Sequence, residues 1–192
     1  MPMKKEKIVR AAIQVFKEKG IEKTKISDIV QVAGVAQGTF YLYFPSKLSV
    51  MPSIAEVMVE KIIEEVDQTV QDDAPFSTKL EQMVDAIFKI NHDYHEVQAL
   101  IYAGLASTEH IKKWETVYEP FYHWVSELLN DAKEKGTIRE TINVKPTSKL
   151  LIGLIESAAE QVYLYDTNKE DQAKVQKSEV NAFLKNALGV QD

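Results

Sequence analysis

The sequence contains no cysteine, and this absence excludes several kinds of protein chemistry. Without thiols the chain cannot form a disulfide framework, a thiolate metal site or a thiol nucleophile. Long apolar runs are also missing, because the longest, residues 99–106, has 8 residues, whereas a membrane-spanning helix needs roughly 20. Charged and polar residues interrupt the segment that follows the basic start, so no signal peptide is indicated. We therefore expect a cytoplasmic protein without a membrane span.

Sequence patterns typical of catalysis are lacking as well. The chain has no GxSxG, Walker A, GxGxxG or HExxH string. His92 and His95 lie three residues apart beside Asp93 and Glu96, but no third metal ligand is evident, and a polar helix end explains the same pattern. We expect no enzymatic activity, no metal and no cofactor.

Charge is divided unevenly along the chain. Residues 1–50 hold 9 Lys and Arg against 4 Asp and Glu, a net charge of +5. The whole chain has 23 against 29, which leaves 14 against 25, a net of −11, for residues 51–192. A basic head on an acidic body suggests that the head alone meets a polyanion. Chance clustering of solvated charges would produce the same division, so charge does not decide the question alone.

Apolar residues recur at helical spacing through most of the chain, and no alternating runs bounded by hairpin turns occur. The pattern predicts an all-α protein of about nine helices. The first helix, about residues 3–19, would end at Gly20 in a left-handed conformation. The second would have about eight residues and stop at Gly34.

A third short segment, residues 37–43, follows the turn at the end of the second helix. Two short helices joined by a glycine-containing turn are the elements of a helix-turn-helix. Phe40 and Phe44 are four residues apart and would face the core. Tyr41 and Tyr43 would then point outward, each with an apolar ring and a hydroxyl that can donate to phosphate.

The stretch FKEKGIEKTKISDIVQVAGVAQGTFYLYFPSK, residues 16–47, resembles the N-terminal DNA-binding domain of the TetR family of transcriptional regulators. The matching positions, in order, are Phe16, Gly20, Thr24, Asp28-Ile29, Ala33-Gly34-Val35, Gly38-Thr39-Phe40-Tyr41, Tyr43-Phe44 and Ser46-Lys47. The resemblance implies a helix-turn-helix domain in residues 1–46 and a helical ligand-binding and dimerisation domain in residues 47–192. It also implies a repressor that a small lipophilic or aromatic inducer releases from a palindromic operator.

By the same resemblance, Gln37 and Thr39 would read base edges, since Gln can pair with adenine and Thr can contact a thymine methyl. The other positions implied at the DNA are Lys25, Ser27, Gly38, Tyr41, Tyr43 and Lys47. Lys4 or Lys5 could add charge. The alternative is that these are ordinary solvated surface residues.

After the resembling segment, Ser46 can cap a long fourth helix that would run from residue 47 to about residue 70. Pro52 would fall six residues inside this helix and predicts a kink. We expect this helix to carry the conformational change. Further helices are predicted at about Pro75 to Tyr94, Glu96 to Ala106, Ser107 to Lys135, Pro146 to Tyr165 and Lys169 to Leu188.

The acidic body is rich in aromatic and sulfur side chains, and pockets between helices of a bundle are mostly apolar with a few polar anchors. The candidate ligand contacts are Met83, Phe88, Tyr102, Trp114, Tyr118, Tyr122, Glu156 and Tyr163. An ordinary core explains most of them equally well. If Glu156 or Glu160 points inward, it would favour a cationic ligand; otherwise both lie on a solvent-facing edge.

The last two predicted helices form the dimer interface in the resembling family, and we expect a homodimer here. Small residues such as Gly153 and Ser157 would allow close helix packing, although a core within one subunit explains them too. The rival hypotheses are a helical small-molecule-binding protein or enzyme with an incidental basic N-terminus, which predicts no DNA binding, and an architectural DNA binder without sequence preference.

Overall fold

The computed structural model describes residues 3–106, 111–165 and 169–191, and in these residues the protein is all-α. This confirms the predicted fold class. The helices are α1 (Lys4–Lys19), α2 (Ile26–Ala33), α3 (Gln37–Tyr43), the 3-10 helix η1 (Leu48–Val50), α4 (Met51–Thr69), α5 (Phe76–Ala106), α6 (Ile111–Glu134), α7 (Val144–Tyr165) and α8 (Lys169–Leu188). None of these described helices is long and apolar enough to cross a membrane.

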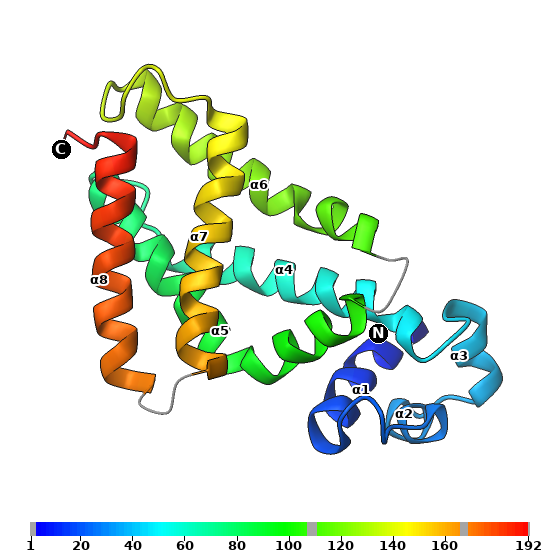
Figure 1. The fold of residues 1–192 in the computed structure, drawn as a ribbon. Coiled ribbons are helices and arrows are strands. Elements are labelled where there is room, and N and C mark those ends of the chain that lie inside the picture. The colour runs from blue at the N-terminus through cyan, green and yellow to red at the C-terminus, as the bar shows by residue number, and fades with distance from the viewer. Residues whose placement is uncertain (1–2, 107–110, 166–168, 192) are drawn as a thin grey trace. The chain divides into compact units, whose positions relative to one another are not determined.

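The chain forms two compact units. The first comprises residues 1–58 and 96–117, and the second comprises residues 59–95 and 118–192. In the first unit α1 packs on α2 and α3, the blue helices of Figure 1. In the second unit α7 packs against α8, and the two helices run in opposite directions. Each unit buries its own apolar side chains.

The helix-turn-helix is held by an apolar centre to which all three of its helices contribute. Ile8 and Phe16 of α1, Ile29 of α2 and Phe40 of α3 are almost completely buried. The spacing of these residues matches one helical face in each element, which is why the pattern predicted the three helices. Such burial removes apolar surface from water and fixes α3 against the other two helices.

The ends of the first two helices differ from each other in one respect. Gly34 follows α2 with φ 65° and ψ 37°, the left-handed conformation that favours glycine. Gly20 follows α1 with φ 76° and ψ 159°, so its φ is positive but its ψ is extended. The left-handed end predicted at Gly20 was therefore wrong in its ψ, and the left-handed conformation occurs at Gly34, which was predicted only to stop the second helix.

The fourth helix begins later than predicted. Ser46 and Ser49 cap one another, since the backbone N–H of each donates to the hydroxyl of the other, at 3.1 and 3.2 Å. They enclose the 3-10 turn η1, and α4 starts only at Met51. Pro52 is thus the second residue of α4, where an α-helix needs no backbone N–H. The expectation that Pro52 lies six residues inside the helix was wrong, and its place near the helix start removes the reason given for a kink.

The predicted fifth and sixth helices form the single element α5, which is interrupted at one residue. Tyr94 has φ −125° and ψ 17°, outside the helical region, so the chain changes direction there without leaving the helix for a loop. The prediction of two helices meeting near residue 95 agrees with this kink, although the two helical segments are counted as the single element α5.

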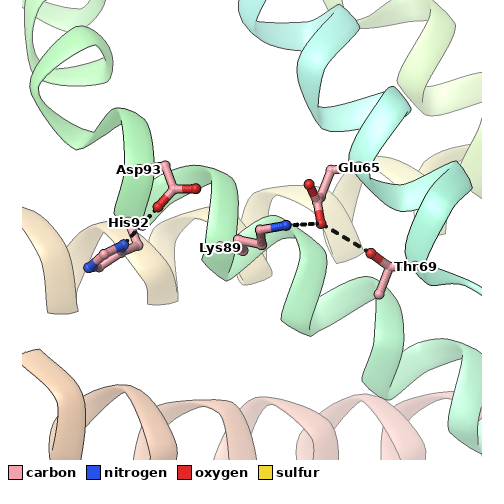
Figure 2. A network of polar contacts seen from close by, with 5 residues as sticks. All are labelled: Glu65, Thr69, Lys89, His92 and Asp93. Carbon is pink, nitrogen blue, oxygen red and sulfur yellow. Dashed lines mark hydrogen bonds and ion pairs between the residues drawn. The ribbon is translucent and has the colours of Figure 1, made fainter.

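In the second unit, ion pairs connect the helices around α5. Glu65 of α4 accepts hydrogen bonds from Lys89 of α5 at 2.7 Å and from Thr69 at 3.2 Å (Figure 2). Lys177 and Lys185 of α8 pair with Asp85 and Glu81 of α5 at 2.8 and 2.6 Å. These contacts are largely exposed, so each adds little stability, and they link α5 to α4 and to α8.

Candidate DNA interface and buried polar centre

The loop between α1 and α2 is built on hydrogen bonds from two side chains. The buried Thr24 hydroxyl donates to the carbonyl of Gly20 at 2.7 Å. Lys47 donates from Nζ to the carbonyls of Ile21, of Thr24 at 2.9 Å and of Glu22 at 3.3 Å. An ammonium group has three donors, and here all of them meet backbone oxygen atoms. Lys47, predicted at a phosphate, thus supports the loop that leads into α2.

The start of α2 is fixed by Asp28. Its carboxylate accepts a hydrogen bond from the backbone N–H of Lys25 at 2.9 Å and pairs with Lys19 at 3.1 Å. The backbone N–H of Lys25, followed by the Lys19 ammonium, lowers the pKa of Asp28 below its usual value. Lys25 and Ser27, two of the predicted DNA contacts, are exposed at this helix start.

The side chains of α3 divide into an inner and an outer set, as predicted. Phe40 is completely buried and Phe44 is nearly so, and their ring centroids are 5.6 Å apart. Tyr41 and Tyr43 keep 50% and 44% of their surface exposed. Tyr41 meets Phe40 edge to face at 5.8 Å. The ring of Tyr41 is therefore positioned by the core while its outer part remains available.

The outer side of α3 also holds the remaining predicted residues. Gln37 and Gly38 are exposed, and Thr39 is half-buried. A Cβ atom added to Gly38 would meet nothing within 4 Å, and Gly38 does not have a positive φ. The fold of this chain therefore gives no reason for a glycine at this place in a helix.

Sequence reasoning missed one residue of this surface. Leu42 is 82% exposed, between the two exposed tyrosines. Its position four residues after Gly38 puts both on the same side of the helix. The sequence could have indicated this exposure. When Phe40 of α3 and Phe44 directly after it both face the core, Leu42 between them must face outward.

The second unit contains a buried polar pair, Tyr118 of α6 and Glu156 of α7. The Tyr118 hydroxyl donates to Oε1 of Glu156 at 2.9 Å, and the two residues are 5% and 8% exposed. Burial raises the pKa of Glu156 to about 8, the hydrogen bond from Tyr118 lowers it, and the charge of Glu160 raises it further. Of the two carboxylates considered in the sequence, Glu156 points inward and Glu160 is half-buried.

The other predicted ligand residues are distributed over α5, α6 and α7. Met83 and Phe88 of α5 are completely buried. The Tyr163 ring, on α7, is 6.2 Å from Phe88, and the Tyr122 ring, on α6, is 5.8 Å from Tyr118. Tyr102 and Trp114 belong to α5 and α6, but their side chains lie outside the described part of the structure.

Asn91 of α5 is a buried polar residue that sequence reasoning did not select. It is fully buried, and its Nδ2 donates to the carbonyl of Ile87 at 2.9 Å, while Oδ1 has no hydrogen-bond partner. A buried acceptor without a partner costs stability and requires an explanation. The signal in the sequence was an amide on the apolar face marked by Ile87 and Ile90.

The two histidines considered as metal ligands lie on α5. His92 Nδ1 is 2.9 Å from Asp93 (Figure 2), and the His92 ring contacts the ring of Tyr163 at 5.2 Å between centroids. Among the side chains that the structure describes, no three His, Asp or Glu residues are grouped as a metal site would require.

The packed pair α7 and α8 carries large exposed apolar side chains in the second unit. They are Leu150 on α7 and Val175 and Phe183 on α8. Gly153 and Ser157 of α7 are exposed too, three and seven residues after Leu150, so they lie on its side of the helix. Ala158 and Ala159 face the core instead.

Comparison with known proteins gives two family matches along the chain. The family described as "Bacterial regulatory proteins, tetR family" matches residues 8–52, and "Tetracyclin repressor-like, C-terminal domain" matches residues 80–188. The HTH-type transcriptional regulator YvdT of Bacillus subtilis (strain 168) is 40% identical over 186 residues, which cover 97% of this chain and 95% of YvdT.

Two solved structures show the same fold. The fatty acid degradation regulator FadR from Bacillus halodurans is 26% identical with a TM-score of 0.76, covering 96% of this chain and 95% of FadR. FadR from Bacillus subtilis, solved in complex with stearoyl-CoA, is 23% identical with a TM-score of 0.75, covering 93% and 96%. With a helix-turn-helix whose aromatic face is exposed and a second helical unit of matching fold, the chain belongs to the TetR family of DNA-binding transcriptional regulators.

Proposed function

We propose that this protein is a homodimeric repressor in the cytoplasm that leaves a palindromic operator when a small lipophilic inducer binds. Residues 1–46 would form the DNA-binding domain and residues 47–192 the ligand-binding and dimerisation domain. The observation that carries the DNA-binding part is the outer side of α3, where Tyr41, Leu42 and Tyr43 expose apolar and phenolic surface beside Gly38. Three consecutive large side chains exposed on one short helix are what a surface that binds a partner would present.

At the operator, Gln37 and Thr39 would meet base edges in the major groove, and Tyr41, Tyr43 and Ser27 would donate to phosphates. Lys25 would contribute charge from the start of α2. We assign Lys47 a supporting role, because its three donors hold the loop before α2. The glycine at position 38 would let the DNA backbone or a base edge approach the helix closely.

Selection of duplexes from a randomised DNA pool tests this assignment and yields the operator. The expected result is a two-fold symmetric motif. Gln37→Ala should then cost roughly 1–3 kcal/mol of binding free energy and relax the preference at a single base pair in each half-site. Gln68→Ala, an exposed glutamine of α4 in the second unit, is the matched control. An unenriched pool, or equal effects of the two alanines, would contradict the proposed reading residues.

The dimer would form through the exposed face of α7 and α8. Leu150, Val175 and Phe183 supply apolar area, while Gly153 and Ser157 leave room for a partner helix. A Cβ atom on Gly153 would meet none of the described residues within 4 Å, so the space is available to a second copy. A two-fold dimer places its recognition helices about 34–36 Å apart, in successive major grooves, which explains a palindromic operator.

Sedimentation at micromolar concentration tests the dimer. Phe183→Asp should produce monomers and remove operator binding, because it puts a charge into an apolar interface. Asn130→Asp, which adds the same charge at an exposed position of α6, should leave the dimer intact. A dimer that survives Phe183→Asp would exclude this face.

The inducer would bind in the second unit, where polar groups lie inside the buried core. Oδ1 of Asn91 has no partner, and the Tyr118–Glu156 pair is buried nearly completely. Bundle cores hold ligands with a few such anchors in an apolar surrounding. Two structural relatives were solved with ligands that carry charged groups: FadR of Bacillus subtilis with stearoyl-CoA, which adds a long acyl chain, and a regulator from Saccharomonospora viridis with choline.

Release of the selected operator by stearoyl-CoA, with coenzyme A alone as control, tests the inducer class. We expect release by the acylated compound only. Asn91→Leu should stabilise the ligand-free protein, since it removes an unpartnered buried acceptor, and should raise the inducer concentration required for release. Lower stability together with unchanged induction would show that Asn91 serves the fold and not the ligand.

A further inference from the structure

A groove of about 440 Å³ lies on the second unit, formed by the end of α4, the loop that leads into α5, and the middle of α6 (labelled in Figure 1). None of the eight ligand residues predicted from the sequence lines it. Its size falls within the range of small-molecule sites. All of its lining residues belong to one compact unit, so the groove exists within that unit alone.

The groove is lined by apolar side chains, which we call the floor, and by acidic side chains, which we call the rim. Ile63, Val70 and Leu128 line the floor, each half-buried, together with Pro120 and the indole of Trp124. These side chains keep apolar surface partly exposed in a concave place, where a ligand could cover it.

Four carboxylates stand around this floor: Asp67, Asp72, Glu127 and Asp131. The cationic groups are fewer. Lys79 lines the groove, and Lys135 pairs with Asp131 at 2.7 Å, so four carboxylates face two ammonium groups. His123 is the remaining titratable side chain of the lining. The local potential therefore attracts a positive charge.

Trp124 is held in one orientation by this rim. Its Nε1–H donates to Oδ1 of Asp67 at 2.6 Å, which links α6 to α4. The hydrogen bond fixes the indole beside the carboxylates, and the face of tryptophan is the best aromatic partner for a cation. An ammonium group in the groove would thus meet carboxylates and an indole while its hydrocarbon part covers the floor.

We propose that this groove binds a small organic cation with an apolar tail, such as an aryl- or alkylammonium compound. The site is separate from the inducer site proposed above and does not depend on it. Charge complementarity selects the cation, and the apolar floor selects the tail. A neutral molecule with the same tail would gain only the second contribution, and an anion would be repelled.

The test uses three compounds with the same tail: 4-phenylbutylamine, which is cationic at pH 7, neutral 4-phenylbutanol and anionic 4-phenylbutyrate. Binding is followed by the NMR signal of the Trp124 Nε1–H, which the variant Trp114→Phe identifies because the chain has 2 tryptophans. The amine should shift this signal at a concentration several-fold below that needed for the alcohol. The carboxylate should not shift it.

Two variants locate the charge. Asp67→Asn retains an acceptor for Trp124, and Glu127→Gln changes an exposed residue, so both should fold. Each should weaken binding of the amine roughly three- to fivefold, the equivalent of one exposed ion pair, and leave the alcohol unaffected. Glu140→Gln removes the same charge outside the groove and should have no effect.

Three outcomes would overturn the proposal. The first is equal binding of amine and alcohol, or no shift by the amine at 10 mM, roughly the weak limit for a specific site. The second is unchanged amine binding in both Asp67→Asn and Glu127→Gln. The third is loss of the Trp124 response in Glu156→Gln, which would place the cation in the buried core and thereby favour the inducer site instead.

Discussion

The two compact units place tyrosine in opposite environments. In the first unit Tyr41 and Tyr43 are about half exposed on a helix of 7 residues. In the second unit Tyr118 and Tyr163 are buried, and the hydroxyl of Tyr118 finds its partner inside, on Glu156. An outward tyrosine offers its hydroxyl to a macromolecule, whereas a buried one commits it to the core or to a ligand within it. The side-chain type is the same, and its surroundings determine the partner it can have.

The units also differ in how they use charge. In the helix-turn-helix, Lys47 and Asp28 bind backbone groups at the ends of helices, so part of the basic head is structural. In the second unit, a buried carboxyl with a raised pKa lies in the core, and four carboxylates line a groove together with Lys79. Net charge per segment therefore overstates what is available to DNA. The net charge of a segment does not show which of its charged side chains already bind other groups within the fold.

The largest effect expected is on the core of the helix-turn-helix. Phe40→Ala removes a completely buried ring and should lower the free energy of unfolding by roughly 3–5 kcal/mol. Tyr41→Ala, the next residue, should change it by about 1 kcal/mol or less while weakening operator binding. Chemical denaturation and operator titration of both variants measure this contrast. Similar stability losses would mean that Tyr41 belongs to the core and that the inner and outer sides of α3 are misassigned.

The next effect concerns the buried carboxyl of the second unit. The pKa of Glu156 is raised from 4.5 to about 8. Between these values the folded state keeps a proton that the unfolded chain releases. The contribution of Glu156 to the free energy of unfolding therefore has its full value below about pH 4.5. It decreases as the pH rises towards 8, by at most about 1.4 kcal/mol per pH unit.

Glu156→Gln removes the titration and keeps an acceptor for Tyr118, so the pH dependence of unfolding should flatten between pH 5 and 8, roughly the interval set by the two pKa values. Urea denaturation at several pH values measures the slope. Glu140→Gln, an exposed carboxylate, should leave the slope unchanged. An identical slope in Glu156→Gln and the unaltered protein would mean that Glu156 is ionised when buried.

Much of the first unit could be predicted from the sequence because its helices depend on residues that lie close together in the chain. Apolar spacing located the three helices, and the four-residue separation of Phe40 and Phe44 determined which rings face inward. The three donors of Lys47 could not be predicted, because their acceptors lie 23 to 26 residues earlier in the chain. Only the folded loop brings Nζ and these carbonyl groups together.

The second unit was predicted in outline, and its binding features were not. Helical periodicity located α7 and α8, but the inward turn of Glu156 depends on packing against α6. The groove residues Asp67 and Trp124 are 57 positions apart, and nothing in either segment indicates the other. Aromatic content suggested pockets in general, whereas the position of a particular groove follows from how α4 and α6 meet.

A smaller effect tests the structural use of charge in the first unit. Lys47→Met preserves most of the side-chain length and removes the ammonium, leaving three carbonyl groups of the α1–α2 loop without their donor. Stability should fall by roughly 1–3 kcal/mol. Lys25→Met, at an exposed position, should leave stability nearly unchanged and reduce the salt dependence of operator binding. If Lys47→Met instead changes the salt dependence and spares stability, Lys47 contacts phosphate and not the loop.

Gly38→Ala should change stability only slightly, and its stability and its operator affinity should move in opposite directions. A methyl group at this position meets nothing within the chain, and Gly38 does not have a positive φ, so alanine should stabilise α3 by roughly 0.5–1 kcal/mol through its higher helix propensity. The same methyl would occupy the space through which DNA approaches, so operator affinity should decrease. Thermal unfolding and operator titration of one preparation measure both quantities. Glycine at position 38 would then represent stability given up for contact with DNA. A variant that is more stable and binds the operator as tightly as before would show that the DNA does not approach α3 on this side.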